Sequence, residues 1–242
     1  MDHQVVSRDE WLALRKAHFL AEKELTHQRD KVLAARRALP WVKVEKPYVF
    51  DGPEGPVTLS DLFEGRSQLF VQHFMFGPGW EAGCPACSLM ADHVDAARQH
   101  FEQADLSFAA VSRAPWPEIE PFKKRMGWSF DWVSSFDNDF NSDFGVSFTE
   151  AEQAAGEPLY NFGTIVPFMD EIQGCSVFCK NEAGEVFHSY STYARGVEGV
   201  IGAFAFLDLA PKGRNETSTM NWVRHHDRYE ASGAARSEAS IG

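Results

Sequence analysis

Cys84 and Cys87, which enclose Pro85 and Ala86, are the residues of this sequence whose types and spacing best suit chemistry. They follow an apolar, strand-like run and a loop rich in Gly and Pro, and they begin a segment with a helical pattern. The start of a helix presents unpaired N–H groups and the positive end of the helix dipole, which stabilise an anion. A thiol in that position has its pKa lowered from ~8.5 to roughly 3.5–7.5. The pair therefore predicts a thiol–disulfide couple.

The helix start assigns separate roles to the two cysteines. Cys84 lies at the mouth of the helix, where we expect an exposed thiolate that attacks a disulfide. Cys87 lies one turn later and more deeply buried, where it would resolve the mixed disulfide. Pro85 suits the first helical position because proline has no N–H to leave unpaired, and we include it in the predicted binding surface.

A lone CxxC motif is also compatible with two other kinds of site. It supplies half of a zinc site, for which Cys175, Cys179 or some of the nine His residues would be the remaining ligands. It also occurs as two ordinary buried thiols. The strand–loop–CxxC–helix context favours the redox pair over both, so we assign no metal and no cofactor.

Two further residues are candidates for substrate binding. Arg113 follows a second apolar strand at its carboxyl end, where α/β sheets place ligand sites. There its cation would stabilise the Cys84 thiolate or bind an anionic substrate; equally, it would be a surface arginine paired with a carboxylate. Trp80, four residues before Cys84, would line the site, although an aromatic side chain in the core or at its rim is the simpler interpretation.

Three residues inside the predicted strands have simpler interpretations. Cys175 and Cys179 would share one face of a strand with Cα atoms roughly 13 Å apart. That separation is too long for a disulfide, so we expect two small buried hydrophobic residues. His73 lies in a buried strand and is expected to be a core histidine with satisfied hydrogen bonds.

Five polar residues in the later loops receive no catalytic role. His225, His226 and Asp227 offer metal-binding or acid–base groups, but a surface or dimer contact is the simpler interpretation. Asn141 and Asp143 are loop residues with good turn chemistry.

The elements around these residues alternate between strand and helix. The pattern predicts buried strands at 67–76, 106–112 and 128–135, helices at 84–104 and 115–127, a hairpin over 175–193 and an apolar helix over 197–210. This order predicts α/β layers around one sheet.

Three segments lie outside this alternation. Residues 1–45 form a predicted N-terminal helical extension, with a capping box of Ser7 and Glu10, packed on a main domain of residues 46–212. Residues 137–174 are interpreted as an insertion in that domain, with a short helix from Thr149 to Gly156. Residues 213–242 form a C-terminal tail, whose last dozen residues have a disordered composition.

Composition limits the partners and the compartment. The 242 residues include 35 acidic and 23 basic side chains, a formal charge of −12 that disfavours nucleic acid and anionic membrane surfaces. There is no run of 18 apolar residues and no apolar secretory signal at the N-terminus. We therefore predict a cytoplasmic protein, in which a disulfide would be transient.

Longer strings extend the argument beyond the CxxC motif. The sequence resembles DUF899, a bacterial family of uncharacterised thioredoxin-like proteins, over nearly its whole length. The segments that carry the resemblance are GCPACSLMADH (83–93), VSRAPWPEIEPFKKRMGWSFDWVSS (111–135), FNSDF (140–144), VFHSYSTYARG (186–196), LDLAPKGRNE (207–216) and WVRHHDRY (222–229). The resemblance implies a three-layer thioredoxin-like fold, with a central mixed sheet flanked by helices, and a redox site. It implies no particular substrate.

Two departures separate the sequence from well-known thioredoxin-fold enzymes. Thioredoxins have a cis proline before the strand that faces the CxxC, whereas Gly174 precedes Cys175 here and Pro167 lies seven residues upstream of Gly174. Peroxiredoxins carry Pro-x-x-x-Thr/Ser-x-x-Cys, but Gly77 and Glu81 occupy the two leading positions. An ordinary thioredoxin or peroxiredoxin is therefore not expected.

The sequence leaves two main hypotheses. The first is a thiol–disulfide oxidoreductase in which Cys84 and Cys87 act on an unknown disulfide or peroxide, with a separate electron-donating reductant. The alternative is a non-catalytic thioredoxin-fold binding protein whose cysteines bind zinc or sense redox state. A third hypothesis is a structural or dimerising protein, with the N-terminal helix and the aromatic-rich tail as its interface.

Overall fold

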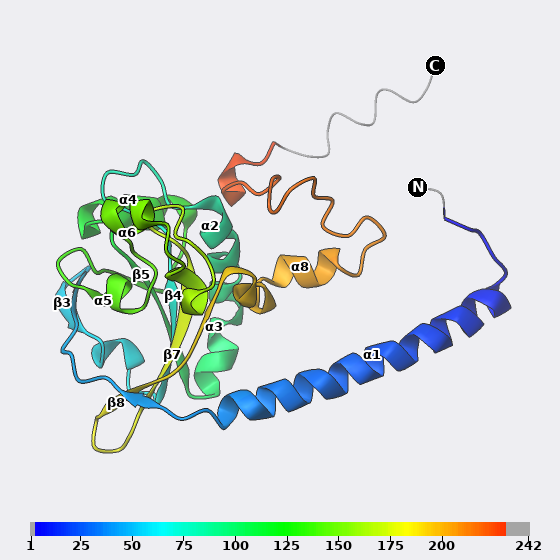
Figure 1. Ribbon diagram of the computed structural model, residues 1–242, viewed down its shortest axis with the longest axis horizontal. Helices are drawn as coiled ribbons and strands as arrows, with labels where there is room; N and C mark the ends of the chain where they lie inside the picture. Colours follow the sequence, from blue (N-terminus) through cyan, green and yellow to red (C-terminus); the bar gives the residue numbers. More distant parts are fainter. Residues whose placement is uncertain (1–2, 231–242) are drawn as a thin grey trace. The chain divides into compact units, whose positions relative to one another are not determined.

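A mixed β-sheet of eight strands is the centre of residues 42–230 in the computed structural model, which describes residues 3–230 (Figure 1). Its strands are β1 (Val42–Lys43), β2 (Val49–Gly52), β3 (Gly55–Thr58), β4 (Gln68–His73), β5 (Leu106–Ser112), β6 (Asp131–Ser134), β7 (Gly174–Lys180) and β8 (Val186–Tyr193). Their order across the sheet is β1-β8-β7-β4-β5-β6-β2-β3.

Helices connect and cover these strands. The α-helices are α1 (Arg8–Arg37), α2 (Pro85–Ala91), α3 (Val94–Gln103), α4 (Trp116–Met126), α5 (Phe140–Asp143), α6 (Glu150–Ala155), α7 (Tyr160–Gly163) and α8 (Gly202–Leu207), and the 3₁₀ turns are η1 (Asp61–Phe63), η2 (Ala194–Val200) and η3 (His226–Arg228). Strands β4, β5 and β6 are parallel, and β7 is antiparallel to both β4 and β8. This arrangement is the α/β, thioredoxin-like fold that the sequence predicts.

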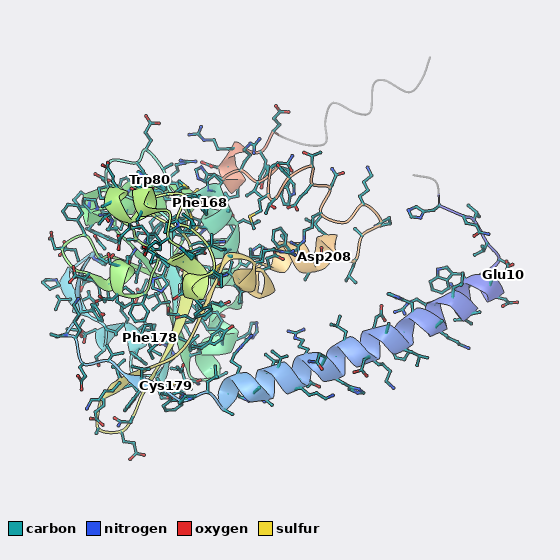
Figure 2. All side chains as sticks on the ribbon, in the orientation of Figure 1. Glu10, Trp80, Phe168, Phe178, Cys179 and Asp208 are labelled. Atoms are coloured by element: carbon teal, nitrogen blue, oxygen red, sulfur yellow. The ribbon has the colours of Figure 1, made fainter. Side chains whose placement is uncertain are left out.

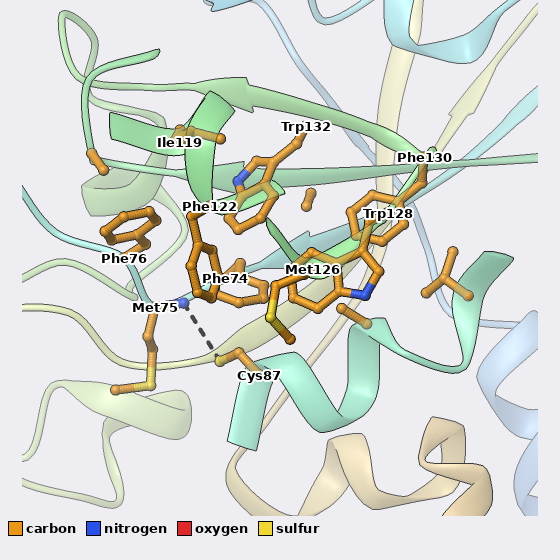
Figure 3. Packing of buried hydrophobic residues seen from close by; sticks show 14 of the residues in the cluster. Phe74, Met75, Phe76, Cys87, Ile119, Phe122, Met126, Trp128, Phe130 and Trp132 are labelled. Carbon is orange, nitrogen blue, oxygen red and sulfur yellow. Dashed lines mark hydrogen bonds between the residues drawn. The ribbon is translucent and has the colours of Figure 1, made fainter. Parts of the chain in front are cut away.

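Alternation along β4 separates two apolar cores. Phe74, just after β4, belongs to the core beneath α2 and α4, where its ring lies 4.5 Å from that of Trp132 (Figure 3). Leu69 and Val71 face the opposite core, which contains Phe140 and the Phe178 ring. Burying aromatic rings on both faces fixes the strand from which the CxxC loop departs.

The single helix predicted over 84–104 is wrong in one detail, because it is broken between α2 and α3. At the break, the Nδ1 of His93 is bonded to the carbonyl of Leu89 at 2.7 Å, while the His93 N–H donates to Met90 instead. The Nε2 of the same ring accepts from the N–H of Ala203 at 3.0 Å. A side chain that takes the carbonyl of residue i−4 competes with the backbone ladder.

The other differences concern short elements. Three short strands, β1, β2 and β3, precede the first predicted strand at 67–76 and occupy the two edges of the sheet. The helix predicted over 197–210 is only η2 and α8, interrupted at Ile201 with extended angles (φ −95°, ψ 93°). Two glycines in this stretch, Gly199 and Gly202, weaken its helical propensity.

The insertion over 137–174 contains three short helices, α5, α6 and α7. The predicted helix after Thr149 is confirmed as α6. Thr149 and Glu152 form a complete capping box, and Gly156 ends the helix with a left-handed φ of 67°.

The N-terminal helix α1 is described by itself, because contacts divide the chain into Met1–Trp41 and Val42–Gly242. The predicted capping box of Ser7 and Glu10 is present, and none of the residues of α1 is buried. Among residues 3–230, the structure has no helix with the length and apolar character needed to cross a membrane. The disorder predicted for residues 231–242 lies outside the described residues.

Candidate functional site

Cys84 and Cys87 lie at the start of α2, after the loop that follows β4. Cys84 immediately precedes the helix, and Pro85 takes the first helical position, as expected. The N–H of Cys84 donates to the carbonyl of Met75 at 2.9 Å. The N–H of Met75 donates to the Sγ of Cys87 at 3.5 Å (Figure 3). The backbone of a single residue, Met75, therefore bonds to both cysteines.

The two cysteines differ in exposure. Cys84 is half-buried and its neighbour Pro85 is exposed. Cys87 is 1% exposed and belongs to the aromatic core around Phe74. Both are free thiols in the structure. Cys84 is therefore the more accessible of the two thiols, and the roles of nucleophile and resolving thiol stay predictions.

Hydrogen bonds separate the acidities of the two thiols. The Cys87 thiol donates to Cys84 and, with the backbone N–H groups of Cys87 and Ala86, lowers the pKa of Cys84 to about 6 against the opposing effect of burial. The pKa of Cys87 is raised well above its ordinary value, first because its proton is held by Cys84 and second because of burial. Near neutral pH the pair is a Cys84 thiolate beside a Cys87 thiol.

Cys175 and Cys179 lie on β7 and are also free thiols. Cys175 is buried, with its Sγ 4.0 Å from the Sδ of Met90, and burial raises its pKa. It fits the predicted small hydrophobic residue, whereas Cys179 is only half-buried (Figure 2). No residue from 3 to 230 has a cis peptide bond, and β7 begins at Gly174 without the proline of a thioredoxin.

Arg113 lies directly after β5, but its charge is paired with carboxylates. Its Nε donates to Glu171, and its Nη2 lies 3.8 Å from Asp170. Glu171 is 1% exposed and also accepts from the Oγ of Ser147 at 2.7 Å. Burial is the main cause that raises the pKa of Glu171. The structure thus gives Arg113 the carboxylate pairing that was the alternative to a contact with Cys84.

Beside this ion pair lies an open cavity of about 530 Å³. Arg113, Asp170 and Ser147 line it together with residues from α6 and the loop before β7. Neither cysteine of the CxxC motif is among its lining residues. The cavity therefore lies between Arg113 and the insertion over 137–174, apart from the CxxC motif.

Trp80 is an aromatic residue at the rim of the core. It is half-buried and packs against the core that contains Cys87, and its backbone N–H donates to the carbonyl of Gly77 at 3.2 Å (Figure 2). A Cβ added to Gly77 would lie 2.9 Å from the Nε1 of Trp80, so this close packing requires glycine. The simpler of the two predictions for Trp80 fits this placement.

His73 is a buried histidine with only half of its hydrogen bonds satisfied. Its Nε2 is bonded to the Oγ of Ser176 at 2.7 Å, while its Nδ1 has no protein partner among the described residues. Burial lowers the pKa of His73 to about 3. In residues 3–230, no group of three or more His, Cys, Asp or Glu side chains is arranged to hold a metal ion.

Two polar side chains lie near the cysteines without having been predicted there: Gln72 was missed by sequence reasoning, and His225 was named without a position. Gln72, inside β4, donates from Nε2 to the carbonyl of Cys87 at 3.0 Å. His225, in the tail, has its Nε2 2.8 Å from the carbonyl of Gly83, the residue before Cys84. The position of Gln72 within β4 does not set it apart from the other residues of that strand. His225 is 142 residues away from its partner in the chain, so the local sequence does not indicate the contact.

Fold and site together define a thioredoxin-like protein with a CxxC pair at a helix start. The chain belongs to the family described as "Bacterial protein of unknown function (DUF899)", whose sequence model matches residues 1–229. This confirms the resemblance found in the sequence. A search of curated proteins found no match.

Solved structures that are similar to this chain include the following three. Peroxidoxin BcpB from Mycobacterium tuberculosis has 15% identity and a TM-score of 0.42, covering 66% of this chain and 95% of its own. Peroxiredoxin Q from Xanthomonas campestris has 15% identity and a TM-score of 0.43, covering 68% and 98%. A putative thiol:disulfide interchange protein DsbE from Chlorobium tepidum has 14% identity and a TM-score of 0.41, covering 69% and 98%.

Proposed function

We propose that this protein is a thiol–disulfide oxidoreductase that uses Cys84 as nucleophile and Cys87 as resolving thiol. The observation that carries the proposal is the asymmetry of the pair. A half-buried Cys84 precedes α2 and receives hydrogen bonds from the Cys87 thiol and two backbone N–H groups. Cys87 is protonated and buried beside it. A thiolate attacks a disulfide, whereas a thiol does not.

Two exchanges account for the reaction. The Cys84 thiolate attacks one sulfur of a disulfide, forms a mixed disulfide and releases the other sulfur as a thiolate. Cys87 then loses its proton and attacks the Cys84 sulfur, which releases the second substrate thiol and leaves a Cys84–Cys87 disulfide. The substrate gains two electrons and the pair loses two, so an external dithiol must reduce the pair again.

A peroxide is a second substrate class for the same residues. The Cys84 thiolate would attack one peroxide oxygen and become a sulfenic acid, while the O–O bond breaks and the other oxygen leaves as an alcohol or water. The Cys87 thiol would then condense with the sulfenic acid, which releases one water and leaves the Cys84–Cys87 disulfide. Gly77 and Glu81 replace the proline and hydroxyl residue of the peroxiredoxin motif. Because those side chains are missing, we propose a disulfide as the preferred substrate.

The test equilibrates the wild-type protein in glutathione buffers and counts free thiols by the mass added on alkylation. We expect one reversible two-electron transition that involves Cys84 and Cys87, while Cys175 and Cys179 stay reduced. The Cys87→Ser variant should accumulate a mixed disulfide on Cys84, and the control Cys179→Ser should behave as wild type. Absence of a reversible Cys84–Cys87 disulfide, or stoichiometric zinc after purification under reducing conditions, would overturn the proposal in favour of a binding protein.

The homodimer and the cytoplasmic location stay predictions. Helix α1 carries large apolar side chains that are exposed, among them Leu14 at 65% and Leu25 at 69%. Exposed apolar residues in one helix favour association. Sedimentation of wild type and a Leu14→Glu/Leu25→Glu variant would test it, with a dimer expected only for wild type and a wild-type monomer as the contrary result.

A further inference from the structure

The described part of the C-terminal tail includes residues 222–229, which lie beside α2 (Figure 1). We propose that His225 is a positioning residue for Cys84, acting through the peptide group between Gly83 and Cys84. The inference rests on the proposed function and adds to the site a residue that takes no part in the exchange itself.

Both polar groups of the Gly83–Cys84 peptide are bonded. The Cys84 N–H donates to the carbonyl of Met75 at 2.9 Å. The Gly83 carbonyl accepts from the Nε2 of His225 at 2.8 Å. A trans peptide is planar, with its C=O and N–H pointing in opposite directions. The continuation of β4 and the C-terminal tail therefore hold this peptide from two sides.

Packing leaves no room for a side chain at Gly83. A Cβ added to Gly83 would lie 2.5 Å from the Cε1 of Phe74 and 2.9 Å from the Cε1 of Phe122. The ring of His225 packs edge-to-face against Phe122, with centroids 5.3 Å apart. The imidazole thus contacts the same aromatic wall that confines Gly83.

A salt bridge fixes the tautomer of His225. The Nη2 of Arg125 lies 3.1 Å from the Nδ1 of His225. The same guanidinium is clamped by Asp227, with Nε–Oδ2 at 2.8 Å and Nη2–Oδ1 at 2.9 Å. Guanidinium nitrogens only donate hydrogen bonds, so the Nδ1 of His225 must be the acceptor. The Nε2 then carries the hydrogen and donates it in the bond to the Gly83 carbonyl. Asp227 and Arg125 therefore orient the imidazole as a donor.

The tail is anchored at two more points. Val223 is buried in the core that includes Leu89 and Met90 of α2. His226 has its Nδ1 2.7 Å from the Oδ1 of Asp92, the residue that follows α2. Because these contacts lie along α2, the tail spans the helix from its last residue to the loop that precedes it. His226 serves as a neighbour of His225 without a contact to Gly83.

The consequence concerns the thiolate. The N–H groups of Ala86 and Cys87 stabilise it only if the Cys84 side chain is aligned with the start of α2. This alignment depends on the backbone angles of Cys84. The peptide group between Gly83 and Cys84 is one of the two peptide groups that define those angles. Loss of the His225 donor would loosen the peptide, and the thiolate would lose part of its stabilisation.

The test measures the rate of Cys84 alkylation against pH, by mass spectrometry, in reduced full-length protein. His225→Phe keeps a ring against Phe122 but cannot donate, and we expect its titration midpoint to rise by on the order of one pH unit. His225→Gln keeps a donor near the position of Nε2 and should restore the wild-type midpoint. The control His226→Ala should titrate as wild type.

The glutathione equilibrium gives a second readout. A one-unit rise in the Cys84 midpoint would make the pair about fivefold easier to oxidise at pH 7, because the reduced form loses thiolate stabilisation. An unchanged midpoint in a folded His225→Phe protein, or an equal shift in His226→Ala, would overturn the inference. If His225→Phe does not fold, Asp227→Asn, which loosens the Arg125 clamp and leaves the imidazole in place, carries the same comparison with a smaller shift.

The two proposals fail in different ways. A wild-type protein without a reversible disulfide would overturn the proposed oxidoreductase, while the alkylation profile would still show whether His225 positions Cys84. A normal disulfide in both wild type and His225→Phe, with equal midpoints, would leave the oxidoreductase standing and remove the role of His225.

Discussion

The backbone N–H of Met75 points at the Sγ of Cys87, 3.5 Å away. The carbonyl of the same residue accepts a hydrogen bond from the N–H of Cys84. Neither contact uses the Met75 side chain, so the pair is held by strand geometry and not by residue type. The two thiols, which differ in reactivity, are held together by the hydrogen bonds between the backbone of Met75 and the first turn of α2.

The first prediction concerns the Cys87 thiol as a hydrogen-bond donor. The depressed pKa of Cys84, about 6, has the Cys87 thiol as its largest cause. Cys87→Ala should raise the midpoint of Cys84 alkylation by on the order of one pH unit, since only the backbone donors remain. In wild type, alkylation should slow as pH falls through about 6, because the thiolate takes up a proton.

The control for this prediction is Cys179→Ala, which removes a half-buried thiol from β7. Its alkylation profile should match that of wild type. A Cys87→Ala protein with an unchanged midpoint would show that the backbone donors alone depress the pKa of Cys84.

The second prediction concerns the glycine before Cys84. Gly83→Ala would place a methyl group 2.5 Å from Phe74, and the resulting overpacking should lower the free energy of unfolding by about 1–3 kcal/mol. Gly199→Ala is the matched control, because its added Cβ meets nothing within 4 Å. Urea unfolding measures the unfolding free energy of both variants. Equal values for Gly83→Ala and Gly199→Ala would contradict the close packing of Gly83.

The CxxC helix start and the two capping boxes could be predicted because each depends on residues close together in the chain. Ser7 with Glu10, and Thr149 with Glu152, are three residues apart and satisfy local backbone donors. The alternation of apolar strands and helices likewise predicted α/β layers around one sheet, and the resemblance to DUF899 implied the thioredoxin-like form of that sheet.

Contacts between distant segments could not be predicted in the same way. Glu171 lies 58 residues from its partner Arg113, and nothing in the local sequence of either residue indicates the other. Asn141, interpreted from the sequence only as a loop residue with turn chemistry, lies in α5, where it is buried and its Oδ1 accepts from the Oγ of Ser135 at 2.9 Å. The break at His93 also depends on a contact with Ala203, which the helical pattern of residues 84–104 does not contain.

The third prediction concerns the buried carboxylate. Arg113→Met would remove the cation beside Glu171, whose pKa burial already raises. A carboxyl with a raised folded pKa contributes stability below its unfolded pKa and loses it as pH rises through the folded value. The variant should therefore lose about 1–3 kcal/mol at pH 8, when the carboxylate is ionised without its partner, and less at pH 5.

Urea unfolding at the two pH values checks this slope. The control Arg195→Met removes an arginine whose side chain is 81% exposed and pairs with Glu198, so its effect should be below about 1 kcal/mol at both values. An Arg113→Met protein whose loss is the same at pH 5 and pH 8 would contradict the ionised state assigned to Glu171.

The fourth prediction concerns acid unfolding through His73. Burial lowers the pKa of His73 from 6.5 to about 3, so between these values the unfolded chain binds a proton that the folded protein does not. Stability from this group is present above pH 6.5 and is lost as pH falls toward 3. The loss should be about 2 kcal/mol between pH 7 and pH 5.

His73→Phe, which can pack with Phe140 and Phe144, should remove that part of the pH dependence, whereas His27→Phe on the exposed α1 should keep it. Unfolding free energies of the three proteins at pH 7 and pH 5 decide the matter, and an equal acid loss in His73→Phe and wild type would show that His73 is not the group that takes up the proton on unfolding.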